Sequence, residues 1–354
     1  MAPRGGSLRP PPTGLGPKLG AMGRLPLAAL AAAVLLAGCG GSDNAKDPAS
    51  QVPAAGGVRD KVRAAQAVTA ADFPAVEGRT LQQVADSAGS AGPELGLATS
   101  VFTVGPNRVA FGIIDDRSGF VYGKTALYVA RGPGAKAQGP YPAPADVLVT
   151  QGRYRSKQAA TEADPFAAVY GARVPFKRPG DYSILAVTKD GAKTFAAPGQ
   201  VKVVTKGEDR IPAIGEPAPK VQTDTKASAR GDLSSIDTRT PPSDMHERSF
   251  ADVVGKQPVA LLFATPQLCQ SRVCGPVVDV GLELKSRYGD RVEFIHQEVY
   301  EGNDPKQGLR APLTRFNLAT EPWLFVVGRD GRITARLEGS FGLQAFEQAL
   351  KTAL

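Results

Sequence analysis

Cys269 and Cys274 are the two residues of this sequence best suited to carry chemistry. They follow a continuous apolar run at 259–264, which predicts a strand buried on both faces, and they precede a helical pattern over 276–288. The N-terminus of a helix carries partial positive charge and unpaired N–H groups, which stabilise a thiolate and lower the pKa of its thiol. Arg272 adds a cation between the two cysteines. The pattern therefore predicts a reactive thiol pair near a helix start.

The four residues between the cysteines set a geometric condition on any disulfide. Two residues five apart in a regular α-helix have Cα atoms roughly 8–9 Å apart, whereas a disulfide needs less than about 7 Å. A bridge therefore requires Cys269 to lie in the loop before the helix, or the first helical turn to unwind. Such a local change would make the redox state of the pair visible to a partner protein.

The N-terminal segment has the layout of a secretory signal. Arg4, Arg9, Lys18 and Arg24 precede position 39 with no acidic residue, and a short apolar block at 25–36 leads into Leu36-Ala37-Gly38-Cys39. These last four residues resemble the lipobox of bacterial lipoproteins, which implies cleavage before Cys39 and diacylglycerol on its sulfur. The alternative is a plain secretory signal with an incidental Cys39, and Met22 is a second candidate start.

The prediction is thus a signal peptide over 1–38 and a chain anchored by lipid to the extracytoplasmic face of the bacterial cell membrane. That compartment permits disulfides. It also removes Cys39 from the thiols and leaves Cys269 and Cys274 as a pair.

Composition and pattern divide the remaining chain into segments. The sequence holds 40 Gly and 30 Pro residues, which indicates linkers and turn-rich β structure. Residues 39–93 are expected to form a flexible tether with a short helix at 81–88, capped by Thr80 and stopped by Gly89. A β-sandwich is expected over 94–205, a linker over 206–213, and an α/β domain over 214–354.

Short antiparallel strands are expected in the first domain at 108–114, 125–129, 168–170 with Val174, 182–187 and 193–204, with a hairpin at Asp190-Gly191. Pro179-Gly180-Asp181-Tyr182 resembles the corner of immunoglobulin-like sandwiches, in which a Tyr hydroxyl bonds back to the corner backbone. The resemblance implies an immunoglobulin-like fold that serves as a spacer or as a protein-binding module.

In the second domain the order of patterns is β-α-β-α-β-β-α, which predicts a central sheet covered by helices. Strands are expected at 259–264, 291–299, 323–327 and 333–337, and helices at 276–288, 309–316 and 341–354.

This second domain resembles the thioredoxin-like superfamily in four stretches of sequence. They are Ile214-Gly215-Glu216-Pro217-Ala218-Pro219 at its start, Pro276-Val277-Val278-Asp279, Thr320-Glu321-Pro322 and Arg329-Asp330-Gly331-Arg332-Ile333. The resemblance implies a thioredoxin-like fold, a cis peptide bond before Pro322, and a Pro322 loop that faces the active cysteines.

The spacing departs from the Cys-x-x-Cys of thioredoxins, and two registers compete. If Pro276 is the mid-helix proline of the family, Cys269 is the nucleophile and Cys274 lies about a turn inside the helix. If Cys274-Gly275-Pro276-Val277 occupies the position of the Cys-Gly-Pro-Cys motif of thioredoxins, Cys274 is the nucleophile. The first register is favoured because Pro276 to Asp279 then also fits.

The expected function is thiol–disulfide exchange with extracytoplasmic protein thiols and disulfides, with an unidentified reductant or oxidant. One alternative is a peroxiredoxin-type peroxidase, although Thr265 lies four residues before Cys269 where those enzymes have three. A second is a non-catalytic scaffold in which the pair forms a structural disulfide. A third is Cu(I) binding by the cysteines with His246 or His296. His246 is expected at a helix start with a capping box at 244–247, and His296 in a strand.

The composition argues against several other classes. The net charge of +8 falls to 38 basic against 34 acidic residues from position 39 onward, which gives little reason to expect nucleic-acid binding. No run of about 18 apolar residues predicts a spanning helix. Two histidines and three cysteines leave little room for a zinc site, so no metal and no cofactor are expected.

Overall fold

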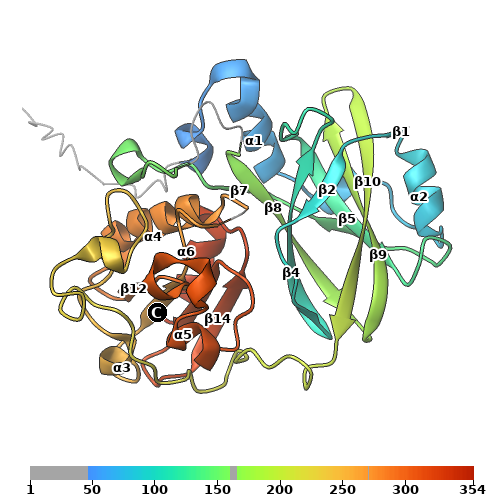
Figure 1. Ribbon diagram of the computed structural model, residues 1–354. Helices are drawn as coiled ribbons and strands as arrows, with labels where there is room; N and C mark the ends of the chain where they lie inside the picture. Colours follow the sequence, from blue (N-terminus) through green and yellow to red (C-terminus); the bar gives the residue numbers. More distant parts are fainter. Residues whose placement is uncertain (1–46, 160–165, 270) are drawn as a thin grey trace, which may run out of the picture. The chain divides into compact units, whose positions relative to one another are not determined.

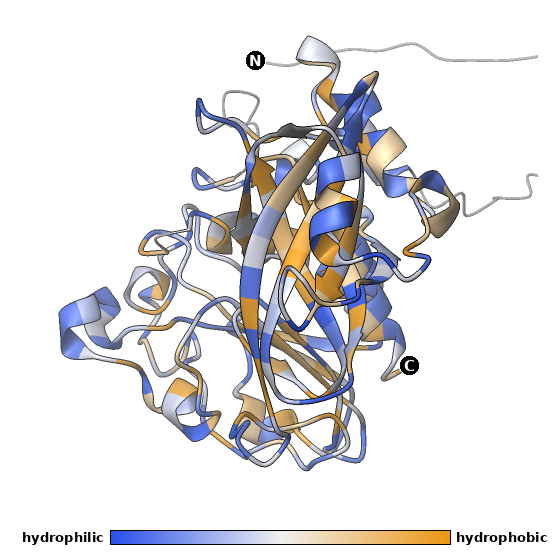
Figure 2. Ribbon diagram, turned by 90° about the vertical axis from the view of Figure 1, so that its right-hand side faces the viewer, coloured by the Kyte–Doolittle hydropathy of each residue, from blue (hydrophilic) through white to orange (hydrophobic). Residues whose placement is uncertain are grey.

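Figure 1 shows the computed structural model, which describes residues 47–159, 166–269 and 271–354. The predicted signal peptide and Cys39 lie outside these residues. Within the described residues, no helix has both the length and the apolar character needed to cross a bilayer. Figure 2 shows hydrophobic residues gathered along the strands, while loops and outward helix faces are largely hydrophilic.

The first half of the chain folds into two facing sheets, as expected for 94–205. One sheet has the order β1-β10-β9-β5-β6 with β3 also on β10, and the other has the order β2-β4-β8-β7. The long neighbouring strands pair antiparallel, whereas the short strands β1 and β3 run parallel to β10, so the first sheet is mixed. The strands are β1 (Ser90–Ala91), β2 (Glu94–Leu97), β3 (Phe102–Thr103), β4 (Gly105–Ile114), β5 (Lys124–Ala130), β6 (Gln138–Pro142), β7 (Ala145–Val147), β8 (Ala168–Phe176), β9 (Gly180–Asp190) and β10 (Lys193–Val204).

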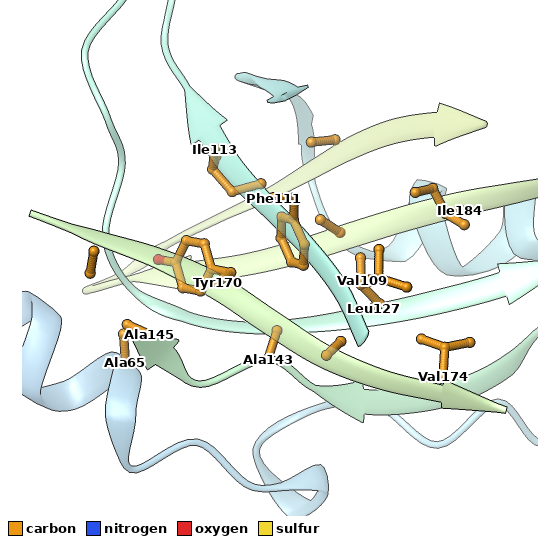
Figure 3. Close-up of a cluster of buried hydrophobic side chains, with 14 of the residues drawn as sticks. Ala65, Val109, Phe111, Ile113, Leu127, Ala143, Ala145, Tyr170, Val174 and Ile184 are labelled. Carbon is orange, nitrogen blue, oxygen red and sulfur yellow. The ribbon is translucent and has the colours of Figure 1, made fainter. Parts of the chain in front are cut away.

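One hydrophobic cluster fills the space between these sheets (Figure 3). Alternate residues of β4, such as Val109 and Phe111, enter it, as the period-two pattern of a strand requires. Phe111 stacks on Tyr170 of β8 with ring centroids 5.5 Å apart. Leu127 of β5 and Ile184 of β9 close the cluster from the other sheet. Shared burial of both inner faces makes this part a β-sandwich.

The expected tyrosine contact at the corner before β9 is present. The hydroxyl of Tyr182 donates to the backbone carbonyl of Arg178 at 3.0 Å. The Tyr182 ring is buried and packs edge-on against Phe176 of β8. The corner therefore ties the start of β9 to the end of β8.

The segment expected to be a flexible tether is ordered in the part that the structure describes. Helix α1 (Val58–Gln66) buries Val62 and Ala65 in the sandwich core. Helix α2 (Leu81–Ser87) forms where expected, with a capping box between Thr80 and Gln83. The tether prediction fails here because Val58, Val62 and Ala65 share one helix face, which the surrounding charged residues obscured.

The second half of the chain contains a four-stranded sheet of order β12-β11-β13-β14. β11 (Val259–Phe263) runs parallel to β12 (Glu293–Gln297) and antiparallel to β13 (Trp323–Val327), which pairs antiparallel with β14 (Ile333–Glu338). Its helices are α3 (Phe250–Val253), α4 (Cys274–Tyr288), α5 (Ala311–Arg315) and α6 (Leu343–Lys351).

Short 3-10 helices occur in both halves of the chain. They are η1 (Pro48–Gln51), η2 (Ala55–Gly57), η3 (Ala70–Asp72), η4 (Gly152–Tyr154), η5 (Leu233–Ser235), η6 (Glu301–Asn303) and η7 (Pro305–Gln307).

Helices cover both faces of this sheet, as the α/β pattern predicted. Leu262 of β11 packs in a cluster with residues of α4 and α6. Its neighbours Leu261 and Phe263 point to the other face, where α3 contributes Phe250 and α5 contributes Leu313. Burial on both faces explains the continuous apolar run of β11.

The helix start expected at 244–247 is absent, and this prediction was wrong. Asp244 pairs with Lys285 of α4 instead of capping a helix. The next helix, α3, begins at Phe250 after Ser249. His246 is buried beside a carboxylate, which the capping pattern gave no reason to expect.

The sandwich and the α/β part form one compact unit rather than two domains on a linker. Residues 206–213 do connect them without a helix or strand of their own. However, Ala110 and Val169 of the sandwich lie in the same hydrophobic cluster as α4 and α6. The buried carboxylate of Asp146 also accepts N–H groups from Gly342 at 2.6 Å and Gln344 at 2.9 Å, at the start of α6.

Candidate functional site

The two cysteines lie at the junction between β11 and α4. Cys274 is the first residue of α4, and Cys269 lies in the loop before it. Both thiols are free, Cys274 is fully buried, and Cys269 is 8% exposed. Helix geometry allows a disulfide only if Cys269 lies outside the helix, and its place in the loop meets this condition. The favoured register placed Cys274 about a turn inside the helix, which is wrong, since Cys274 begins it.

Hydrogen bonds make Cys269 the more acidic thiol. Its pKa is lowered to about 6, most of all by a hydrogen bond from the Cys274 thiol. The Ser271 hydroxyl, 3.2 Å from the Cys269 Sγ, and the backbone N–H groups of Cys274 and Val273 act in the same direction. Burial opposes them and is outweighed. The start of α4 therefore stabilises a thiolate on Cys269, as expected for a helix N-terminus.

Cys274 is the opposite member of the pair. Burial raises its pKa well above the usual value, and so do its hydrogen bond to Cys269 and the negative charge there. At neutral pH the pair therefore holds one proton, on Cys274, and one thiolate, on Cys269. Cys269 can therefore act as the nucleophile, while Cys274 stays protonated until a second step.

The loop before β13 acts electrostatically on the same thiols through Glu321. The peptide bond between Glu321 and Pro322 is cis, as the resemblance implied. Glu321 carries a raised pKa because of its burial and then because of the charge on Cys269. Trp323 fixes the loop by donating its indole N–H to Thr320 Oγ1 at 3.0 Å. The sequence gave no reason to expect the Glu321 carboxyl beside the thiols.

A segment of the sandwich covers the first turns of α4. We call residues 151–159 the covering segment. The backbone and hydroxyl of Ser156 donate to Asp279 of α4 at 3.0 and 3.1 Å. A Cβ on Gly275 would lie 2.6 Å from both the Cβ and the carbonyl oxygen of Gln158. Gly275 therefore permits the backbone of this segment to approach the helix next to Cys274.

Asp279 also holds a buried ion pair beneath the site. Its carboxylate accepts from Arg239 Nε at 2.8 Å, and both side chains are buried. Burial still raises the pKa of Asp279 to about 6. Arg239 donates further to the backbone carbonyls of Tyr154 and Pro241. The pair fastens α4 to the covering segment and to the long loop before α3.

The two histidines lie together, and both are close to the carboxylate of Asp237. His246 Nε2 is 3.1 Å from Asp237 Oδ2, and His296 Nδ1 is 3.4 Å from the same oxygen. Among the described residues, the grouping of metal-ligating side chains contains these three and neither cysteine. The Cys–Cys–His set of the copper alternative is therefore not brought together there.

The chain is similar to solved structures over part of its length. No family model matches the chain, and no curated protein matches it. Two solved structures from Chlorobium tepidum are similar at 15% identity over 40% of this chain. One is assigned as the thiol:disulfide interchange protein DsbE; the match covers 98% of its length, with a TM-score of 0.30. The other is a thiol:disulfide interchange protein of the thioredoxin family; the match covers 97% of its length, with a TM-score of 0.28.

A third solved structure is similar to the chain, the PKD domain of human VPS10 domain-containing receptor SorCS2. It is 15% identical, with coverage of 33% of this chain and 77% of that one and a TM-score of 0.17. Likenesses at these TM-scores carry no argument about function, which rests on the thiol geometry.

Proposed function

We propose that this chain is a lipid-anchored, extracytoplasmic thiol–disulfide oxidoreductase with a thioredoxin-like domain and an immunoglobulin-like sandwich. The observation that carries the proposal is the asymmetry of the thiol pair. Cys269 is held as a thiolate by donors at the start of α4, with its pKa lowered to about 6. Cys274 is fully buried beside it and keeps its proton.

The chemistry follows from this asymmetry. The Cys269 thiolate attacks one sulfur of a partner disulfide, forms a mixed disulfide and releases the other sulfur as a thiolate. Cys274 then loses its proton and attacks the Cys269 sulfur, which forms the Cys269–Cys274 disulfide and frees the second partner thiol. The partner gains two electrons and the chain loses two. The reverse sequence oxidises a partner dithiol.

Two features of the loop before β13 support this assignment. Glu321 interacts electrostatically with both thiols, and the Glu321–Pro322 peptide bond is cis. We expect the Pro322 loop to meet an extended substrate segment beside Cys269, as the resemblance to thioredoxin-like proteins implies. The lipobox-like Leu36-Ala37-Gly38-Cys39 supports attachment to the outer face of the membrane, where partner proteins carry disulfides. The partners are extracytoplasmic proteins and a dithiol or disulfide protein that restores the starting state.

Trapping a mixed disulfide tests the proposal. Cys274→Ser removes the resolving thiol, so the variant should accumulate a covalent, reductant-sensitive complex through Cys269 when mixed with a disulfide-bonded protein such as oxidised insulin. Cys269→Ser is the matched control and should form at least about tenfold less adduct at neutral pH, because the remaining thiol is buried and protonated.

The same pair of variants separates the alternatives. A scaffold would give no adduct with either variant. A peroxidase would give a sulfenic acid on Cys269 in Cys274→Ser after peroxide treatment, without preference for protein disulfides. Either outcome would overturn thiol–disulfide exchange as the function.

A further inference from the structure

Both histidines of the sequence lie in one buried cluster that the thiol chemistry does not use. His246, His296 and Asp237 are each no more than 1% exposed. Each residue offers one possible ligand atom, and these three atoms all lie within 4.8 Å of one another. The two imidazole rings are 5.1 Å apart. The cluster joins the long loop before α3 to the end of β12.

The hydrogen bonds around His296 leave a lone pair facing a carboxylate. Its Nε2 lies 3.0 Å from the backbone carbonyl of Ala264, so Nε2 carries the proton. In a neutral ring, Nδ1 would present its lone pair to Asp237 Oδ2, which lies 3.4 Å away. Two buried acceptors that face each other need a cation between them.

A second buried carboxyl group lies close to the cluster. Glu298, the second residue after His296, is fully buried and acts electrostatically on it. Negative side chains in the interior favour a bound cation.

The two spacings from Asp237 to the histidines fit a small tetrahedral ion. Ligand bonds of about 2.0–2.1 Å at tetrahedral angles place ligand atoms about 3.3–3.4 Å apart. Asp237 Oδ2 lies 3.1 Å from His246 Nε2 and 3.4 Å from His296 Nδ1. Nitrogen and carboxylate ligands of this kind suit zinc and its divalent first-row neighbours.

The contacts around His296 and Asp237 are of the kind that hold metal ligands in place. Ligating histidines usually donate their other ring N–H to a backbone carbonyl or carboxylate, as His296 does to Ala264. The Asp237 carboxylate is oriented by the backbone N–H of Ser243 at 2.7 Å and of Arg239 at 2.9 Å. Ala264 opens the loop that carries Cys269, so the cluster also supports the start of the thiol loop.

We propose that Asp237, His246 and His296 form a binding site for a divalent first-row transition ion, most suitably Zn²⁺, which braces the long loop against β12. The site is separate from the cysteines and does not depend on the proposed exchange activity. Its ligand atoms are Asp237 Oδ2, His246 Nε2 and His296 Nδ1.

The test uses the full chain with all three cysteines replaced by serine, so that no thiol competes for metal. Histidine labelled with ¹⁵N gives signals from two imidazoles alone. Zn²⁺ added after chelator treatment should shift His246 Nε2 and His296 Nδ1 together, with saturation at one equivalent, and should raise the thermal midpoint. Asp237→Asn should lose this midpoint rise, with an affinity at least about 10–100-fold weaker. Asp224→Asn, which removes a carboxylate outside the cluster, should keep it.

A spectrum in which His296 stays protonated on both nitrogens through the Zn²⁺ titration would overturn the proposal, because a proton would then be the cation. Unchanged Zn²⁺ binding in Asp237→Asn would also overturn it. If Asp237→Asn fails to fold, the imidazole shifts of the cysteine-free chain still decide between metal and proton.

Discussion

At Cys269, several weak donors act on one sulfur atom. The Cys274 thiol, the Ser271 hydroxyl and two backbone N–H groups each favour the thiolate, and together they outweigh the cost of burial. Much of this donor set depends on Cys269 staying in the loop, close to the first turn of α4. The chemistry of the pair therefore depends on a few local hydrogen bonds.

Alkylation of Cys269 should follow its thiolate. In the reduced chain, its rate with iodoacetamide should rise with pH, reach half its maximum near pH 6 and level off above pH 7, as the lowered pKa requires. Ser271→Ala removes one donor and should move the midpoint to higher pH. Site-resolved mass spectrometry provides the measurement. A midpoint near pH 8.5 in the unmodified chain would contradict the account.

The same pKa has a consequence for stability. The thiol of Cys269 is more acidic in the folded chain than its usual value of 9.0. Its contribution to stability is therefore present at high pH and is lost as pH falls through about 6. Compared with Cys269→Ser, the reduced chain should gain stability between about pH 6 and 9, measured by urea unfolding. A flat difference across that window would contradict the lowered pKa.

At the residue scale the sequence indicated Cys269, Cys274 and Pro322, because cysteines and a proline before a strand are recognisable from their types and spacing. It could not indicate Glu321, which interacts with Cys269 only through the tertiary fold. Asp237 and His246 lie in a long stretch without periodicity, so nothing local predicted their contact with His296. Such contacts depend on tertiary packing alone.

At the scale of elements, helix α4 connects the thiols to the sandwich. Its first turn begins with Cys274, and the covering segment lies against Gly275. Asp279, one turn later, accepts hydrogen bonds from Ser156 and Arg239. The position of the helix start, and with it the donor set of Cys269, is therefore fixed by residues from both halves of the chain.

Two glycines of α4 provide a matched test of this contact. Gly281→Ala should raise stability by up to about 1 kcal/mol, since its new Cβ would meet neighbours at 3.5–3.6 Å and alanine favours helix. Gly275→Ala should lower it by about 1–3 kcal/mol, because its Cβ would lie 2.6 Å from Gln158. Urea denaturation compares them. Equal stabilisation by both changes would show that the covering segment does not lie on α4.

Most regular elements were predictable because their patterns are local. The β11 run, the α4 stripe and the hairpin between β9 and β10 each carry a clear period or turn signal. Helix α1 was missed because its apolar face consists of Val58, Val62 and Ala65 among charged residues. The helix expected at 244–247 failed because Asp244 has a tertiary partner in Lys285, which a capping pattern cannot show.

At the scale of the whole molecule, the described chain is a sandwich and an α/β part with a shared core. The hydrophobic cluster of α4 and α6 includes Ala110, Leu148 and Val169 from the sandwich. The carboxylate of Asp146 caps α6 from the sandwich side. The sequence indicated a β-sandwich and an α/β part but not their shared core, because each strand and helix pattern describes its own element and not its neighbours.

Helix α1 belongs to this core, and adjacent alanines test that claim. Ala65→Asp places a charge in the sandwich interior and should destabilise the chain by about 3 kcal/mol or more. Ala64→Asp makes the same change at an exposed position and should cost less than about 1 kcal/mol. Thermal unfolding of both variants gives the comparison. Similar small effects would mean that α1 is a detachable part of a tether.

The reduction potential of Cys269 and Cys274 shows whether the two residues form a redox-active pair. The measurement is mass-tagged alkylation of both cysteines across a series of glutathione poises. We expect a reversible two-electron transition with a midpoint between about −120 and −270 mV, the range of exchange catalysts. A disulfide that resists reduction below about −300 mV would mark a structural bridge and would contradict the account.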